Sequence, residues 1–207
     1  MQSESSCVFC QEEALGTYLL AETEHFMTVC DRSPVAEGHV LLIPKLHYRC
    51  YASIPTDLSK EILGIKEEVS SFLSTYYTAL IFFEHGSAGQ TVPHAHLHMM
   101  PTPKRGIEGD IVTSLLSNMG QIVEVSGIVD LLDSYEKIGP YLYWEQDGVS
   151  YVVKSPEVES GYFQNVVARW TGRTGEAERR YTGVKEFRSI KEKWDHRTVK
   201  RPERRVS

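Results

Sequence analysis

The sequence predicts an α+β protein, in which an antiparallel five-stranded sheet packs against one helix and a smaller α+β extension follows. Three observations lead to this prediction. Three short strand-like runs precede a long amphipathic stretch, two more strand-like runs come after it, and the pattern becomes less regular beyond residue 105. We therefore expect one domain over residues 1–105 and a C-terminal extension with a basic tail over residues 106–207.

The first three strands are expected over residues 15–21, 25–31 and 38–43, which are short apolar runs separated by turn-like segments. Adjacent strands with short connections favour an antiparallel meander. The helix is expected over residues 57–77, because Thr56 is a suitable N-cap and apolar residues recur there at helical spacing. It should lie on one face of the sheet.

The last two strands of the first domain are separated by a glycine-rich loop. Residues 79–84 read as an apolar strand, residues 85–91 as the loop, and residues 92–99 as the fifth strand. The order of elements is therefore three strands, a helix and two strands, which leaves one face of the sheet free for chemistry.

Three histidines stand at two-residue spacing in the last of these strands. Successive side chains of a strand point to opposite faces, so His94, His96 and His98 share one face, about 6.6 Å apart at the backbone. The residues between them are apolar and belong to the core. Three imidazoles in a line do not easily close on one metal ion, whose nitrogen ligands lie at about 2 Å. We therefore expect the three histidines to have different roles.

The extension is expected to be a second, less regular unit. Its polar and basic last 25 or so residues indicate a loosely held end. The elements expected before that end are short helices over 111–118, 127–134 and 160–171, and a hairpin over 141–154 with its turn at Asp147 and Gly148.

Charge is unevenly distributed along the chain, whose net charge is −6. Residues 167–207 hold 13 Lys or Arg against 6 Asp or Glu, a balance of +7, and residues 1–166 hold 9 against 22, a balance of −13. A basic tail can steer a polyanion such as a nucleotide or nucleic acid, or it can lie as an arm on the acidic body. Both interpretations stay open.

The N-terminal residues show neither a basic region nor a long apolar run, and no later stretch approaches the length of a membrane span. We expect a soluble, cytoplasmic protein. Four cysteines are too few for a disulfide framework, and Cys30 and Cys50 lie in apolar contexts that favour buried, inert thiols. Cys7 and Cys10 form a C-x-x-C, which is either a metal knuckle or a redox pair. Metal is favoured, because no strand precedes Cys7 as a redox pair requires.

The histidine strand, preceded by Gly89 to Val92, closely resembles the histidine triad family of nucleotide hydrolases and transferases. Residues 31–47 resemble the second signature of the family, "CVFC" at 7–10 resembles its zinc-binding members, and "FFEHG" at 82–86 resembles a bacterial-type variant. The resemblance covers about residues 7–103. It implies the histidine triad fold and a nucleotide-binding domain over residues 1–105.

The resemblance also implies roles for the residues of the expected site. His96 corresponds to the nucleophile that takes the nucleotidyl group, and this suits a neutral imidazole, which attacks and leaves easily near pH 7. His98 donates to the phosphate or fixes the tautomer of His96. The substrate-binding residues implied are Asp31 for the ribose, His39 facing the triad, and Gln90 and Thr91 with the loop amides for the phosphate oxygens. Asp31 can equally be a simple turn residue, and His39 a structural one.

A structural zinc site is implied in the same way. Zinc needs four ligands, of which Cys7 and Cys10 supply two. The zinc-containing relatives, and the related galactose-1-phosphate uridylyltransferases, imply His47 and His94 as the other two. The rival third and fourth ligands are Cys50 and His85.

The function expected is that of a nucleotidyl hydrolase or transferase, which acts on a nucleoside phosphoramidate, a dinucleoside polyphosphate or another nucleotide conjugate through a covalent nucleotidyl-histidine. One alternative is a hydrolase in which His94 and His96 share a catalytic metal. Another is a non-catalytic nucleotide-binding or scaffold protein with the extension as its interaction surface. The resemblance implies a homodimer, for which residues 58–84 offer an apolar, isologous surface. The extension either covers the site, through residues such as Gln164 and Arg169, or packs as a small separate core.

Overall fold

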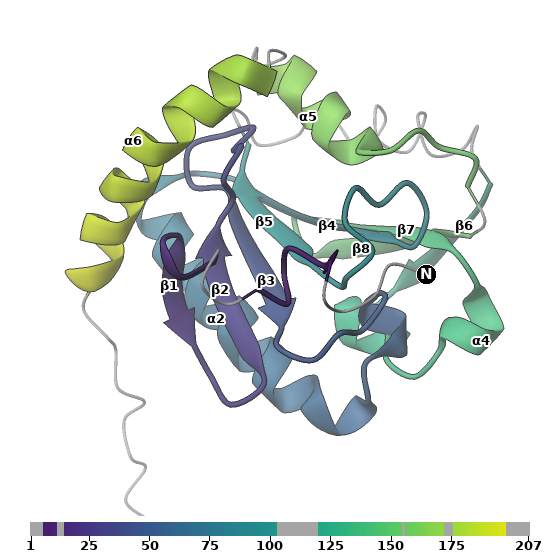
Figure 1. Ribbon diagram of the computed structural model, residues 1–207. Coiled ribbons are helices and arrows are strands. Elements are labelled where there is room, and N and C mark those ends of the chain that lie inside the picture. Colours follow the sequence, from purple (N-terminus) through teal and green to yellow (C-terminus); the bar gives the residue numbers. More distant parts are fainter. Residues whose placement is uncertain (1–5, 12–14, 103–119, 155, 172–175, 198–207) are drawn as a thin grey trace, which may run out of the picture.

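A computed structural model describes residues 6–11, 15–102, 120–154, 156–171 and 176–197. Its strands form one antiparallel sheet of eight, in the order β1-β2-β3-β5-β4-β7-β8-β6 (Figure 1). The strands are β1 (Leu19–Glu22), β2 (Phe26–Cys30), β3 (Val40–Pro44), β4 (Leu80–Gly86), β5 (Leu97–Pro101), β6 (Gln121–Val125), β7 (Tyr141–Gln146) and β8 (Val149–Lys154). The helices are α2 (Ser59–Tyr76), α4 (Tyr135–Ile138), α5 (Tyr162–Thr171) and α6 (Glu176–Asp195), with short 3-10 turns at Tyr51–Ser53, Thr56–Leu58 and Ile128–Leu131.

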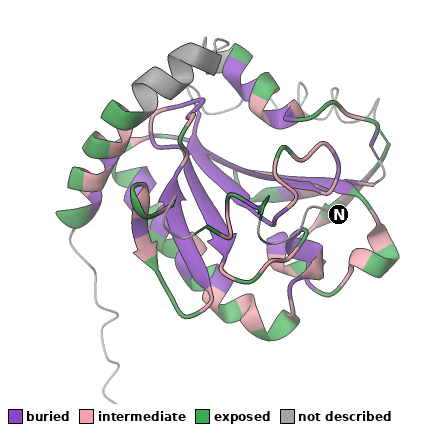
Figure 2. Ribbon diagram, viewed as in Figure 1, coloured by how far each residue is buried: buried purple, intermediate pink, exposed green. Residues whose placement is uncertain are grey.

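The central strands are buried on both faces, as the continuous burial along β2, β3 and β5 in Figure 2 shows. Helix α2 covers one face, and its buried residues recur at helical spacing: Ile62, Ile65, Val69, Phe72 and Leu73. Helix α5 covers part of the other face, where Phe163 and Val167 pack with Phe83 of β4 and Trp144 of β7. The predicted α+β fold with a packed helix is thus confirmed.

The prediction of a five-stranded sheet is wrong, because strands of the extension continue the same sheet. The hairpin predicted over 141–154 is present, and Asp147 and Gly148 at its turn have φ angles of 51° and 81°, as a type I′ turn requires. Strand β7 of this hairpin pairs with β4 from Ile81 opposite Gln146 to Gly86 opposite Tyr141. The predicted boundary at residue 105 therefore falls between two strands of one sheet.

Other elements of the extension depart from the prediction in part. Helix α5 confirms the helix expected over 160–171, whereas the segment 127–134 forms a 3-10 turn followed by the short α4. Strand β6 was not predicted, and the helix expected over 111–118 lies outside the described residues. None of the described helices combines the length and apolar character that a membrane crossing needs.

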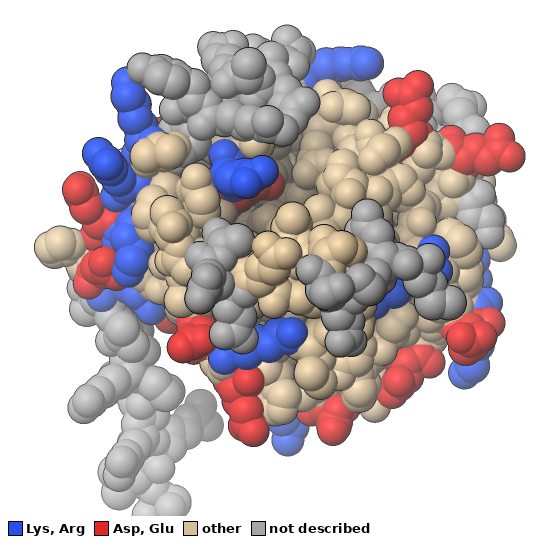
Figure 3. All heavy atoms as spheres, viewed as in Figure 1, with Lys and Arg blue, Asp and Glu red and all other residues tan. Residues whose placement is uncertain are grey.

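The C-terminal end is not loosely held as far as the structure describes it, because α6 lies against the body. Ile190 and Trp194 are buried, Lys193 pairs with Glu37 at 3.0 Å, and Arg197 stacks on Trp194 at 3.7 Å from the ring centroid. Basic and acidic side chains accordingly alternate along this edge of the molecule (Figure 3). For the described part of the tail, the arrangement favours an arm on the acidic body over a free electrostatic guide.

The surface proposed for a homodimer is occupied within the chain. The outer edge of β4 is paired with β7, and the apolar stripe of α2 is packed on the sheet. A homodimer stays a prediction, and within residues 58–84 the exposed apolar side chains of α2, Leu63 and Tyr76, are still available to it.

Glu84 is a fully buried carboxyl that links β4 to its neighbours. It accepts a hydrogen bond from the Tyr51 amide at 2.7 Å and another from the Tyr141 hydroxyl, which in turn accepts one from the Ala52 amide at 3.1 Å. Burial raises the pKa of Glu84 from 4.5 to about 8. The neutral acid is therefore the form that the fold accommodates.

We expect this carboxyl to make stability depend on pH. Because its folded pKa is raised, its stabilising contribution is complete below pH 4.5 and is lost as pH rises through about 8. Urea unfolding of wild type at a series of pH values should show this loss as a lower free energy of unfolding. The loss is at most about 5 kcal/mol, because each pKa unit corresponds to about 1.4 kcal/mol. Glu84→Gln should flatten the profile, whereas Glu124→Gln on the exposed face of β6 should not. Identical profiles for Glu84→Gln and wild type would show that Glu84 titrates normally.

Candidate active site

The three histidines do not all lie in a strand, because β5 begins only at Leu97. His94 and His96 stand in the segment before it, where the His94 amide donates to the Val92 carbonyl at 2.8 Å and the Ala95 amide to the Tyr48 carbonyl at 2.7 Å. All three histidines are nonetheless buried, with at most 2% of the residue exposed. Ala95, Leu97 and Met99 are buried as well, so burial does not separate the histidines from the residues between them, and the strand expected over 92–99 starts later.

A cavity of about 500 Å³ opens beside His96 and His98. One side of it is apolar and is formed by Val8, Phe9, Leu15, Tyr18, Val29 and Leu41. Its polar lining near the histidines is formed by Asp31, Arg32, Ser33 and Thr91. Residues of the extension complete the lining: Ser160, Gly161, Gln164 and Asn165.

His96 presents one nitrogen with a free lone pair. Its Nδ1 lies 2.6 Å from the His94 carbonyl oxygen, which can only accept, so Nδ1 carries the proton. Nε2 is then the unprotonated nitrogen, and no hydrogen bond to it is found from the described residues. Burial lowers the pKa of His96 below its ordinary 6.5. The imidazole is therefore neutral at pH 7, which is the nucleophilic form.

His98 presents the opposite kind of group, a free N–H. The Val35 amide donates to His39 Nδ1 at 3.4 Å, so the proton of His39 is on Nε2. His39 Nε2 donates to His98 Nδ1 at 2.9 Å, and Asp31 Oδ2 lies 3.6 Å from His39 Nε2. The proton of His98 must then be on Nε2.

The Nε2–H of His98 is buried and has no hydrogen-bond partner among the described residues. The ring is held by Phe83, which stacks on it at 4.3 Å with an interplanar angle of 12°. Burial lowers the pKa of His98 well below its ordinary value, so the ring is neutral. An unsatisfied buried donor is costly, and a ligand oxygen in the cavity can satisfy it.

Asp31 closes a turn and also lines the cavity, whereas its role toward the ribose stays a prediction. Its Oδ1 accepts the Ser33 amide at 2.7 Å, which closes a local turn. Its Oδ2 lies near His39, and the residue lines the cavity. A turn residue is thus positioned with one carboxylate oxygen available to a substrate hydroxyl.

The two residues of the glycine-rich loop are placed differently. Thr91 lines the cavity. Gln90 does not line it, and its Nε2 donates to the Arg49 carbonyl at 2.8 Å. The role of Gln90 as a phosphate donor stays a prediction, and it requires the side chain to leave this partner.

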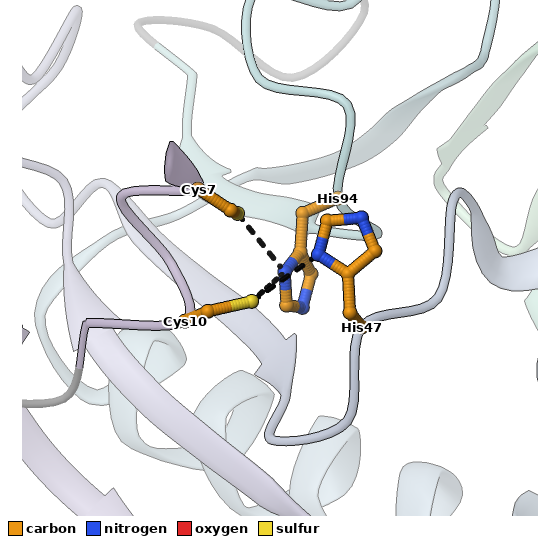
Figure 4. Close-up of side chains that lie close together, drawn as sticks. All are labelled: Cys7, Cys10, His47 and His94. Atoms are coloured by element: carbon orange, nitrogen blue, oxygen red, sulfur yellow. Dashed lines mark hydrogen bonds between the residues drawn. The ribbon is translucent and has the colours of Figure 1, made fainter. Parts of the chain in front are cut away.

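A second cluster brings together the four predicted metal ligands, Cys7, Cys10, His47 and His94 (Figure 4). Their ligand atoms all lie within 4.8 Å of one another. The Cys10 Sγ to His47 Nδ1 distance is 3.2 Å, and His94 Nδ1 lies 3.4 Å from Cys7 Sγ and 3.5 Å from Cys10 Sγ. Ligands of a tetrahedral zinc, at about 2.3 Å for sulfur and 2.0 Å for nitrogen, are separated by about 3.5 Å. The donor set and its spacing therefore fit zinc.

The outer contacts of this cluster support the same ligand set. His94 Nε2 lies 2.9 Å from the Pro44 carbonyl and donates to it, which leaves Nδ1 unprotonated and able to bind a metal. The rival ligands, Cys50 and His85, lie outside this cluster. Cys50 Sγ contacts Ser53 Oγ at 3.5 Å, and His85 Nε2 accepts the Phe163 amide at 3.1 Å.

The alternative in which His94 and His96 share a catalytic metal receives no support. Both nitrogens of His94 are directed away from the cavity, one to the cysteines and one to Pro44. His96 Nδ1 is occupied by a carbonyl. The two histidines thus have no pair of nitrogens that converge on one ion.

The extension supplies several cavity residues, and only some of them were expected from the sequence. Gln164 was a candidate for covering the site and lines the cavity, whereas Arg169 does not line it. Ser160 and Asn165 were not singled out, and the one available signal was the mixture of aromatic and amide residues in the predicted helix. The apolar contribution of Val8, one residue after a metal ligand, was missed as well.

Comparisons with known proteins match the first half of the chain. The family model described as "HIT domain" matches residues 14–105. An uncharacterized 16.1 kDa HIT-like protein of Mycoplasma pneumoniae is 30% identical over 111 residues, which are 51% of this chain and 77% of that protein. An adenosine 5′-monophosphoramidase of Candida albicans, HNT1, is 31% identical over 111 residues, 49% of this chain and 73% of that protein.

Among solved structures, a zinc-bound histidine triad family protein from Mycobacterium smegmatis is 26% identical. The match covers 51% of this chain and 80% of that chain, with a TM-score of 0.41. The family match ends at residue 105, so Ser160 to Asn165 lie outside it.

Proposed function

We propose that this chain, which belongs to the histidine triad (HIT) family, hydrolyses a nucleoside 5′-phosphoramidate or a related nucleotide conjugate through a nucleotidyl-His96 intermediate. One observation carries the proposal. The tautomers that the hydrogen bonds impose give His96 a free lone pair and His98 a free N–H beside the same cavity. A nucleophile and an oxyanion donor side by side are what phosphoryl transfer needs. The relative from Candida albicans, a monophosphoramidase, supports the choice of substrate.

In the first step, the lone pair of His96 Nε2 attacks phosphorus and the bond from phosphorus to the leaving nitrogen breaks. The leaving amine departs with that electron pair and takes up a proton from solvent. The His98 Nε2–H donates to a phosphate oxygen, whose negative charge grows in the transition state. The product of this step is a nucleotidyl-His96.

In the second step, water attacks phosphorus and the bond from phosphorus to His96 Nε2 breaks. The electron pair returns to Nε2, and the water loses a proton to solvent, so the products are a nucleoside monophosphate and a free amine. The proton of His96 stays on Nδ1, which donates to the His94 carbonyl throughout, and this sets the reactive tautomer in advance. If an alcohol or phosphate replaces water, the same intermediate gives transfer.

The two sides of the cavity suit the parts of a nucleotide. The apolar side, with Leu15, Tyr18 and Leu41, suits the faces of a base. Asp31 lines the same cavity, which supports the proposal that it accepts from ribose hydroxyls. Thr91 and the His98 N–H then lie beside the phosphate. The cytoplasmic location expected from the sequence stays a prediction.

We further propose that Cys7, Cys10, His47 and His94 hold a structural zinc ion. When bound, the ion cross-links the N-terminal segment to the segment before β5. Phe9, between the two cysteines, meets the His96 ring edge-on at 5.2 Å and lines the cavity. The metal site thus positions one wall of the active site and takes no part in the chemistry.

Purified protein incubated with adenosine 5′-phosphoramidate tests the proposed function. We expect release of AMP and ammonia in catalytic amounts, followed by chromatography. A nucleotide-binding protein without activity would bind AMP and release nothing. The absence of turnover on phosphoramidate, on dinucleoside polyphosphates and on other nucleotide conjugates would contradict the proposal.

The donor role of His98 gives a separate expected result. His98→Ala should lower kcat by about 10² to 10³-fold, as removal of an oxyanion donor does in other enzymes. Gln90→Ala should cost less, since its amide is already bound to the Arg49 carbonyl. Circular dichroism of both variants checks that they fold. A larger loss of kcat in Gln90→Ala than in His98→Ala would show that Gln90, and not His98, is the main donor to the phosphate.

A further inference from the structure

We propose that the segment Ser160–Asn165 forms the leaving-group subsite, and that this subsite takes uncharged, hydrogen-bonding amines in preference to a polyphosphate. The inference rests on the proposed function, because it concerns the group that leaves when His96 attacks. It goes beyond the family match, because this segment lies outside residues 14–105.

The segment is attached directly to the loop that precedes the histidines. The Gly161 amide donates to the Gly89 carbonyl at 2.8 Å, and Ser160 Oγ donates to the Gln90 carbonyl at 3.4 Å. The fit is close, since a Cβ added at Gly89 would lie 2.7 Å from the Glu159 carbonyl oxygen. Gly89 and Gly161 both have a φ of 71°, which glycine adopts without strain. This segment, which is the polar wall of the cavity, therefore forms one fixed structure with the loop.

The segment is also fixed from the sheet. The Phe163 amide donates to His85 Nε2 at 3.1 Å, and the Phe163 ring lies 5.3 Å from both Phe83 and Trp144. Phe83 is the residue that stacks on His98. The Phe83 side chain of β4 thus positions both His98, the proposed donor, and the polar wall.

Polar side chains of this wall are available to a ligand. Gln164 and Asn165 line the cavity, and no side-chain hydrogen bond is found for either among the described residues. A second, independent observation points to a ligand at the same place. His98, only 1% exposed, has an unpartnered Nε2–H and lines the same cavity. One cavity is therefore lined both by the unpartnered donor of His98 and by the amide side chains of Gln164 and Asn165.

The position of the wall indicates which part of the substrate it meets. The base belongs to the apolar side of the cavity, and the phosphate belongs beside His96 and His98. In an in-line displacement, the leaving group departs on the side opposite the attacking nitrogen. The polar side chains that the extension adds to the lining are not needed for the base, the ribose or the phosphate, so we assign the leaving group to them.

The charge of the cavity limits the kind of leaving group. Among the described residues, its lining holds one cationic side chain, Arg32, and one anionic side chain, Asp31. In Figure 3 the hollow shows tan residues beside a blue and a red side chain. A polyphosphate leaving group needs several cations or bound metal ions. Amide and hydroxyl groups are instead suited to a neutral polar amine.

Three substrates that share the adenylyl group test the assignment. They are adenosine 5′-phosphoramidate, which releases ammonia, its N-substituted derivative with glycinamide, and diadenosine tetraphosphate. Wild type should have its highest kcat/KM for the glycinamide derivative and its lowest for the tetraphosphate. Gln164→Ala should lower kcat/KM for the glycinamide derivative by about tenfold or more, as loss of a hydrogen-bonding partner for a substrate does. The parent phosphoramidate should change by less than about twofold, because ammonia is too small to reach the wall.

Matched controls and binding data keep the test decisive. Gln121→Ala, at an exposed position of β6, should leave all three rates unchanged. Equal losses on both phosphoramidates, or no loss on either, would overturn the subsite, and a preference for the tetraphosphate would overturn the charge argument. If wild type turned over none of the substrates, the proposed function would fail. Calorimetric binding would then still decide the subsite, since Gln164→Ala must weaken the glycinamide derivative alone.

Discussion

His96→Asn lowers turnover of a nucleoside phosphoramidate by about 10⁴-fold or more, as expected when a covalent nucleophile is removed. The amide of Asn has no basic lone pair to attack phosphorus. Binding of the nucleotide should change little, because Asp31, Thr91 and the His98 N–H all remain. The variant therefore separates binding from chemistry.

The control for this variant is His196→Asn, the same change at an exposed position after α6. It should keep wild-type turnover. Steady-state kinetics gives kcat, and calorimetry with AMP gives the affinity. Near-normal kcat in His96→Asn would mean that water attacks the substrate directly and that His96 has another role.

One zinc ion per chain is the second expected result, together with its loss in Cys7→Ser. The substitution removes one of two thiolates from a site whose folding energy comes from the metal. Cys7 is 1% exposed, so the N-terminal segment should detach and remove Phe9 from beside His96. We expect a lower Tm and a KM raised about tenfold or more, by loss of an apolar wall of the site.

Cys50→Ser is the matched control for the metal site. Burial raises the pKa of Cys50 to about 11, and its Sγ contacts Ser53 Oγ outside the cluster of predicted ligands. Elemental analysis should therefore give about one equivalent of zinc in wild type and Cys50→Ser, and little in Cys7→Ser. Metal-free protein with unchanged Tm and activity would contradict the zinc site.

The core of the first domain was predictable because it depends on local patterns. Helix α2 shows its apolar stripe in the sequence, and β2 and β3 are short apolar runs between turns. The start of β5 was misplaced, since Pro93 lacks the amide that a strand needs and the pairing begins only at Leu97.

Contacts between distant residues could not be read from the sequence alone. His94 and Cys7 are 87 positions apart, and their association was expected only from the family resemblance. The pairing of β7 with β4 depends on a strand edge that no local pattern reveals. The end of the chain was expected to be loose because it is strongly polar. The buried Trp194 and the ion pair of Arg197 with Glu68 instead attach α6 to the body.

The roles of the site histidines were implied by resemblance, and the structure adds the tautomers. The orientation of His39 depends on the Val35 amide, four residues away across a turn. The wall contributed by Gln164 depends on the contact of Gly161 with Gly89. Neither contact has a sequence signature, because each results from tertiary packing.

Intact mass spectrometry of protein quenched during turnover tests the central claim most directly. Wild type should gain the mass of one nucleoside monophosphate, and peptide mapping should place it on His96. The adduct should be labile to acid, as a phosphoramidate is, and His96→Asn should gain none. An adduct on another residue, or normal turnover in rapid-quench samples that never contain an adduct, would contradict the account.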